Sequence, residues 1–126
     1  YQPSVGVPLV CRGPGVRRGL LLRFPATTLD VTATFLDYAG VAALPEMESR
    51  SLRPHLEGRT DRHRDYVLSG LGSWRLVLQD RYKYVLGFGS GPLLFDLAND
   101  PLENENLVDK MPAVARRLGR ILGESR

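Results

Sequence analysis

The residues of this chain that could carry chemistry are few and lie apart in the sequence. Cys11 is the single cysteine, so the chain can form no internal disulfide and contains no CxxC metal pair. His55 and His63 are the two histidines, and they have no cluster of carboxylates beside them. Histidines in that setting are weak indicators of a metal or acid–base site. These residues alone predict no catalytic and no metal-binding position within the chain.

Three glycines near the start have a spacing that resembles a nucleotide-binding loop. Gly13, Gly15 and Gly19 follow a short apolar run as G-x-G-x-x-x-G. The dinucleotide fingerprint has one residue fewer before its third glycine, and a helix follows it at once. Neither condition is met here, so the sequence predicts a turn and no phosphate-binding loop.

The charge is spread along the chain and does not form one basic surface. Seventeen basic residues face fourteen acidic ones, which leaves a net charge of +3. The densest basic stretch, residues 59–64, contains Asp61 and is closed by Asp65. A nucleic-acid surface usually combines a basic stripe with stacking aromatics, so a solvated surface is the better interpretation. No apolar stretch approaches the roughly 18–20 residues of a membrane helix. We therefore expect no nucleic-acid and no membrane partner.

The beginning of the chain predicts one strand. The run Val5 to Arg12 is mainly apolar and is closed by Gly13-Pro14-Gly15, which is typical of a buried strand that ends in a turn. Pro8 cannot donate to a strand ladder and instead favours the start of a strand or a sheet edge. Tyr1 is not a methionine and opens no signal peptide, so the compartment stays open.

The next segment predicts a helix over residues 30–40. Asp30 is expected to cap it by accepting from free backbone N–H groups, and Gly40 is expected to end it. Val31, Phe35, Leu36 and Ala39 share one apolar face. Residues 51–58 predict a short helical turn. Residues 59–64 are polar, are expected to cross the surface, and are the candidate boundary of this half.

Beyond that boundary the pattern changes to short β-type runs. Strands are predicted over residues 66–69, 74–78, 82–86 and 93–97, and residues 79–81 join two of them as a tight hairpin. Residues 87–92 form a glycine-rich loop, and Asn99-Asp100-Pro101 is a turn signal. A last amphipathic helix is predicted over residues 111–123, with Pro112 in its first turn.

Two stretches of this sequence together resemble the C-terminal portion of the sulfatases of the alkaline-phosphatase superfamily. Residues 7–16 and 30–40 are similar to the pattern VPLIVRGPGV followed by DIxPTLLDLAG. Residues 74–84 and 94–107 are similar to WRxVxxxRYKYI followed by LYDLxxDPxExxNL. Residues 51–58 and 64–65 also fit in order, so the resemblance covers nearly the whole chain.

The resemblance implies an α/β fold in two parts. Residues 1–58 would be the last strand and helix of the large alkaline-phosphatase-like catalytic α/β domain. Residues 59–126 would be a small C-terminal α+β subdomain, an antiparallel β-sheet with a packed helix. The rest of the sulfatase chain would then be the main partner, and a homo-oligomer remains possible.

The implied activity is hydrolysis of sulfate esters, with formylglycine as nucleophile and Ca²⁺ as Lewis acid. Formylglycine arises in the family from cysteine in C-x-P-x-R or C-x-A-x-R. Cys11 stands in Cys-Arg-Gly-Pro-Gly, which matches neither motif, so a small buried thiol is expected. The nucleophile and the metal ligands are expected upstream of this chain. No catalytic or metal residue is carried over, and the isolated chain is expected to be inactive.

Some sulfatases shape the rim of the substrate pocket with C-terminal residues. The candidates here are Trp74, Arg75 and the loop of residues 87–92. For Trp74, Tyr82 and Tyr84, which lie on short predicted strands, we expect core aromatics with a wet polar tip in preference to stacking platforms.

Two other functions stay open at this point. A phosphonate monoester or phosphodiester hydrolase of the same superfamily would have a similar C-terminal portion. A non-enzymatic module could instead pair with itself through the free edge beside residues 5–12. The sequence leaves the natural substrate open among aryl, carbohydrate and other small sulfates.

Overall fold

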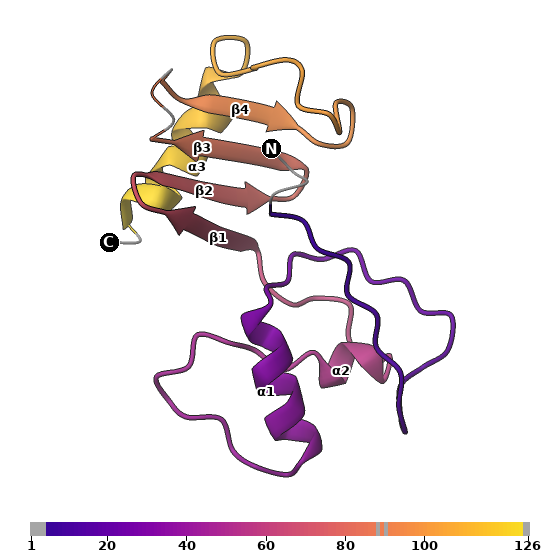
Figure 1. Cartoon of the computed structure of the whole chain (residues 1–126). Coiled ribbons are helices and arrows are strands. Elements are labelled where there is room, and N and C mark those ends of the chain that lie inside the picture. Colours follow the sequence, from indigo (N-terminus) through magenta and orange to yellow (C-terminus); the bar gives the residue numbers. More distant parts are fainter. Residues whose placement is uncertain (1–4, 88, 90, 125–126) are drawn as a thin grey trace. The chain divides into compact units, whose positions relative to one another are not determined.

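The computed structural model describes residues 5–87, 89 and 91–124. These residues form two compact units, one of residues 9–64 and one that combines residues 5–8 with residues 65–124. The first unit holds the helix α1 (Leu29–Tyr38) and the short helix α2 (Arg53–Leu56). The second holds four strands and the helix α3 (Pro112–Glu124) (Figure 1). Among the described residues, no helix combines the length and apolar character needed to cross a membrane.

The helix α1 forms where the sequence predicts a helix, but its first turn is built differently. Asp30 lies inside the first turn, and its carboxylate reaches back to accept the backbone N–H of Thr27 at 2.8 Å. The expected forward cap is therefore wrong, although the side chain still satisfies a backbone donor at the helix start. Gly40 follows the helix with a φ of 71°, the left-handed geometry that glycine adopts without strain.

The face that α1 buries is opposite to the predicted one. Its buried residues are Asp30, Ala33 and Thr34, whereas Phe35 of the apolar face is 70% exposed. The cause is a set of hydrogen bonds on the polar side. The Thr34 hydroxyl donates to the carbonyl oxygen of Asp30 at 2.6 Å and accepts the backbone N–H of Leu52 at 2.8 Å. Side-chain hydrogen bonding thus outweighs the apolar stripe in setting the rotation of the helix.

The strand predicted over Val5 to Arg12 is wrong for this structure. The segment is extended, but no described strand pairs with it, and Val10 is 90% exposed. Cys11 is exposed as well, so the predicted buried thiol is also wrong. A strand needs a neighbouring ladder to satisfy its backbone groups, and without one its N–H and C=O groups face water.

The second half folds into the predicted antiparallel sheet. Its strands are β1 (Tyr66–Leu71), β2 (Trp74–Gln79), β3 (Tyr82–Leu86) and β4 (Leu93–Asp96), paired in the order β1-β2-β3-β4. Asp80 turns the β2–β3 hairpin with a φ of 54°, a conformation that aspartate tolerates better than most residues.

One face of the sheet packs against α3, which lies across it in Figure 1. Val77, Tyr84 and Leu94 lie opposite one another in the strand register and share this face. They form one core cluster with three residues of α3, which are Ala115, Leu118 and Leu122. Tyr84 is therefore a core aromatic, as the sequence predicts.

A buried ion pair ties a loop to the sheet. Lys83 is 1% exposed and lies on β3 between core positions 82 and 84, so it points away from α3. Its Nζ donates to Oε1 of Glu103 at 2.6 Å, and Glu103 is also buried. Asn106 fixes the same loop by accepting the backbone N–H of Leu94 at 2.9 Å. These two contacts hold the connection from β4 to α3 against the sheet.

Candidate functional site

The predicted rim residues lie beside a pocket in the unit that contains the sheet. The pocket has a volume of about 370 Å³ and opens between β1, β2 and the end of α3. Its walls come from the end of β1, the turn into β2 and the last turn of α3. The lining residues are Leu68, Ser69, Gly70, Leu71, Gly72, Trp74, Arg75, Leu76 and Leu122.

Trp74 and Arg75 enter this pocket because they begin β2 directly after a tight turn. Gly72 in that turn has a φ of 61°, which brings β2 back against β1 at once. Trp74 pairs with Leu71 and Arg75 with Gly70. Gly70 has no side chain, and a Cβ there would meet the Arg75 side chain at 3.2 Å. Glycine at this position therefore leaves space for the arginine stem.

The start of the glycine-rich loop also meets the pocket turn. At Gly87 a Cβ would lie 2.0 Å from the carbonyl oxygen of Ser73 and 2.8 Å from the Cα of Trp74, so only glycine fits. The structure thus brings Trp74, Arg75 and the first residue of the predicted loop together. Residues 88 and 90 of that loop lie outside the described residues.

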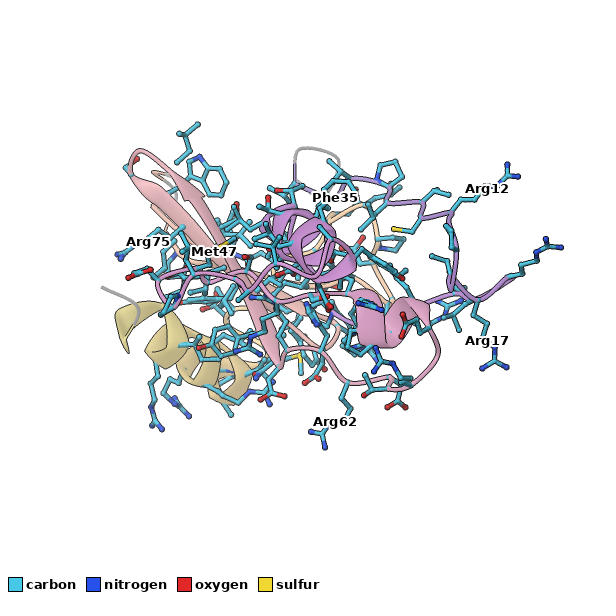
Figure 2. All side chains as sticks on the ribbon, turned by 90° about the horizontal axis from the view of Figure 1, so that it is seen from below. Arg12, Arg17, Phe35, Met47, Arg62 and Arg75 are labelled. Carbon is cyan, nitrogen blue, oxygen red and sulfur yellow. The ribbon has the colours of Figure 1, made fainter. Side chains whose placement is uncertain are left out.

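Arg75 presents an available positive charge. Its side chain is exposed, extends away from the sheet in Figure 2, and makes no ion pair with a described acidic side chain. Arg81 in the next turn is different, because its Nε donates to Asp96 at 2.6 Å and its Nη2 donates to the other oxygen. An unpaired guanidinium next to a half-buried indole ring can bind an anionic group on an organic molecule.

A second cluster of ionisable groups lies in the unit of residues 9–64, and the sequence did not predict it. Asp30 is fully buried and accepts hydrogen bonds from the backbone N–H groups of Thr27 and Arg50, from His63 Nε2 at 3.1 Å, and from Arg64. The two side-chain donors lie 33 and 34 residues further along the chain. No local spacing could reveal such a contact.

The electrostatics of this cluster favour a structural role. Burial alone would raise the pKa of Asp30, but the hydrogen bonds of Thr27, Arg50 and His63 and the charge of Arg64 outweigh it and lower the pKa. Burial lowers the pKa of His63, more than the hydrogen bond to Asp30 raises it. His63 is therefore neutral near pH 7 and donates its Nε2–H. An Asp30 carboxylate with four donors has no free position for a metal or a proton.

The side chains of both histidines are buried, whereas residues 59–62 are exposed, as the sequence predicts for a stretch that crosses the surface. His55 is 3% exposed, and its Nε2–H donates to the carbonyl oxygen of Arg62 at 2.8 Å. The rings of Phe24, His55 and His63 pack within 5.1 Å of one another, centroid to centroid. This ring cluster draws residues 62–64 against the loop before α1.

The described residues do not form a metal site. In that part of the chain, no three histidine, cysteine, aspartate or glutamate side chains gather closely enough to hold an ion. The candidate site is the pocket of Trp74 and Arg75, whose guanidinium and indole ring can bind an anionic organic molecule. The Asp30 cluster, by contrast, holds the fold together.

Comparison with known proteins places this chain among sulfatases. It is 34% identical over 141 residues to the Delta 4,5-hexuronate-2-O-sulfatase of Bacteroides thetaiotaomicron, covering 100% of this chain and 28% of that protein. It is 31% identical over 138 residues to Arylsulfatase K of Gallus gallus, covering 97% of this chain and 26% of that protein. The chain thus spans about a quarter of the length of the curated relatives it matches. No protein-family model matches it.

Solved structures agree with these relatives. A 2-O GAG sulfatase superposes with a TM-score of 0.77 at 30% identity, over 90% of this chain and 28% of that one. The phosphonate monoester hydrolase of Silicibacter pomeroyi superposes with a TM-score of 0.76 at 23% identity, over 91% of this chain and 28% of that one, which shows a shared fold. The fold is therefore the expected alkaline-phosphatase-like α/β type. The chain belongs to the sulfatase family and corresponds to the C-terminal portion of those enzymes.

Proposed function

We propose that this chain is the C-terminal scaffold of an enzyme that hydrolyses sulfate esters. The observation that carries the proposal is the 34% identity to a hexuronate sulfatase across the whole chain. That relative and the 2-O GAG sulfatase are both named for carbohydrate sulfates. A sulfated sugar is therefore the substrate class that we favour among the aryl, carbohydrate and other small sulfates.

The proposal assigns the reacting groups to the portion of the enzyme that this chain does not span. Formylglycine would supply the nucleophile there, and Ca²⁺ would stabilise charge on the sulfate oxygens. The residues described here do not fit either group. Cys11 lies in an exposed Cys-Arg-Gly-Pro-Gly segment, and the buried carboxylate of Asp30 is already saturated with donors. No step of the reaction is assigned to this chain.

We further propose that the chain contributes to two domains of that enzyme. Residues 1–58 would complete the large catalytic α/β domain, and residues 59–126 would form the small C-terminal subdomain. In this arrangement Trp74 and Arg75 would stand at the rim of the substrate pocket. Arg75 would attract the negative charges of a sulfated sugar, and the half-buried Trp74 would offer an apolar surface to the sugar ring.

The test of this function compares two substrates on the intact enzyme that carries this chain. We expect turnover of a chromogenic aryl sulfate in the presence of Ca²⁺ and little turnover of the matching aryl phosphonate. The isolated chain should turn over neither. Preference for the phosphonate would favour the rival hydrolase, which the structural likeness at 23% identity supports only at the level of fold. Sulfate turnover by the isolated chain would overturn the assignment of the reacting groups.

A further inference from the structure

The outer stripe of α1 is apolar and exposed. We use this name for Val31, Phe35, Leu36 and Ala39, which fall on one side of the helix. Phe35 and Ala39 are exposed, and Val31 and Leu36 are half-buried. Figure 2 shows Phe35 on the α1 ribbon. The two charged residues of the helix, Asp30 and Asp37, lie on the other side, so the stripe carries no charge. A helix stripe of this composition is normally buried.

The helix cannot rotate to bury this stripe within its own unit. Asp30 is held by Thr27, Arg50, His63 and Arg64, and the Thr34 hydroxyl is held by Leu52. Turning α1 would break these buried hydrogen bonds and leave a buried carboxylate without donors, which is strongly unfavourable. The exposure of the stripe is therefore built into the unit, and a cover must come from outside it.

A second apolar element in the same unit lacks a partner. Leu9 is 51% exposed and Val10 is 90% exposed, in an extended segment with no paired strand among the described residues. An extended segment with free backbone groups and apolar side chains is suited to joining the edge of a sheet. The unit therefore presents a helix stripe and an unpaired extended segment, the two elements that an α/β domain uses to cover a sheet and to extend it.

We infer that the portion of the sulfatase that this chain does not span packs against the outer stripe of α1. The inference rests on the proposed function. The chain spans about a quarter of its relatives' length, so the enzyme has a large remainder to supply the cover. The uncharged stripe offers nothing to a nucleic acid or an anionic membrane surface, which bind through cations. A domain core is the partner that matches it.

The experiment produces the enzyme as two co-expressed polypeptides, this chain and the remainder, with a tag on each. Phe35→Glu in this chain should abolish co-purification, because a carboxylate would be buried against an apolar surface. Phe35→Leu keeps an apolar side chain at this position, so the two polypeptides should still co-purify. Leu102→Glu is the matched control, since Leu102 is 75% exposed in the other unit and the change adds the same charge. An unchanged circular-dichroism spectrum of the isolated Phe35→Glu chain would show that its own fold persists.

The outcomes separate the docking from the catalysis. Loss of the complex with Phe35→Glu, together with retention in both controls, supports the docking. If the unaltered chain forms the complex but that complex hydrolyses no sulfate ester, the proposed function fails and the docking stands. Equal binding of Phe35→Glu and Leu102→Glu overturns the docking, and so does the absence of any complex with the unaltered chain. An isolated chain that forms a dimer, which Phe35→Glu dissociates, assigns the stripe to a second copy and also overturns it.

Discussion

Arg75 and Arg81, which lie at opposite ends of β2, show how position decides what an arginine does. Arg81 leaves the β2–β3 turn toward Asp96 and is held by both carboxylate oxygens. The same ion pair lowers the pKa of Asp96. Arg75 leaves the start of β2, where no described carboxylate is within reach, and its guanidinium stays exposed. The first arginine stabilises the sheet, and the second is available to a ligand.

Arg75→Ala in the intact enzyme should therefore raise KM for a sulfated substrate and leave kcat unchanged. An exposed charge pair contributes only modestly to the free energy of binding, so we expect KM to increase by up to about fivefold. Steady-state kinetics with an anionic sulfated sugar measures the effect. Arg116→Ala is the control, because Arg116 is exposed on α3 and does not line the pocket. Identical KM values for the two variants would remove Arg75 from the substrate rim.

At the scale of the elements, the connection from β4 to α3 shows why a loop can be as well fixed as a strand. Glu103 adopts a φ of 58°, which is unusual for a residue with a side chain. In that conformation its carboxylate accepts a hydrogen bond from Lys83 on the face of the sheet opposite α3. The loop thereby supplies the charge that allows a lysine to be buried on the face of the sheet opposite α3. The ion pair thus couples the loop to the strand.

Glu103→Gln should accordingly lower the free energy of unfolding by about 3–5 kcal/mol, because it leaves the buried Lys83 ammonium without its anion. Glu105→Gln makes the same chemical change two residues away. Glu105 pairs with Lys110 on the surface, so its substitution should change stability little. Denaturant unfolding of the two variants gives the comparison. Similar midpoints for both would show that the buried ion pair is not stabilising.

At the scale of the whole molecule, the two compact units differ in how they respond to acid. Both histidines of the sequence belong to the unit of residues 9–64. The folded unit keeps His63 neutral by lowering its pKa below the ordinary 6.5, so the unfolded chain takes up the proton first. Stability must then fall as the pH drops below about 6.5. Asp30, whose pKa is also lowered, adds a further loss only as the pH falls below its ordinary 3.8.

We expect acidification from pH 7 to pH 5 to destabilise residues 9–64 and to leave the unit with the sheet almost unchanged. Trp74, the single tryptophan, reports on the sheet through its fluorescence, and hydrogen exchange of the α1 amides reports on the other unit. His63→Gln retains a donor for Asp30 but does not titrate, so it should flatten the pH response of α1. Equal losses in the two units, or an unaltered response in His63→Gln, would contradict this account.

Much of the fold follows from local patterns in the sequence. The sequence predicts the strands from the apolar runs and from the turn at residues 79–81, and it predicts the start of the last helix from Pro112. These elements can be predicted because each depends on neighbours within a few residues. The family resemblance also came from the sequence, since its motifs are read in order along the chain. Phe35 and Val10 show the limit of this reasoning. Their apolar character predicts burial, but burial requires a partner surface.

The tertiary structure alone decided which face of α1 is inside. Asp30 lies 33 residues from His63 and 34 residues from Arg64 in the sequence. These residues meet through long-range contacts that no periodicity encodes. Once a buried carboxylate has four donors, breaking that set costs more than exposing an apolar stripe. The sequence by itself therefore determined the elements and the family. Only the folded chain determined how those elements are turned, because the strongest interactions in it join residues from distant segments.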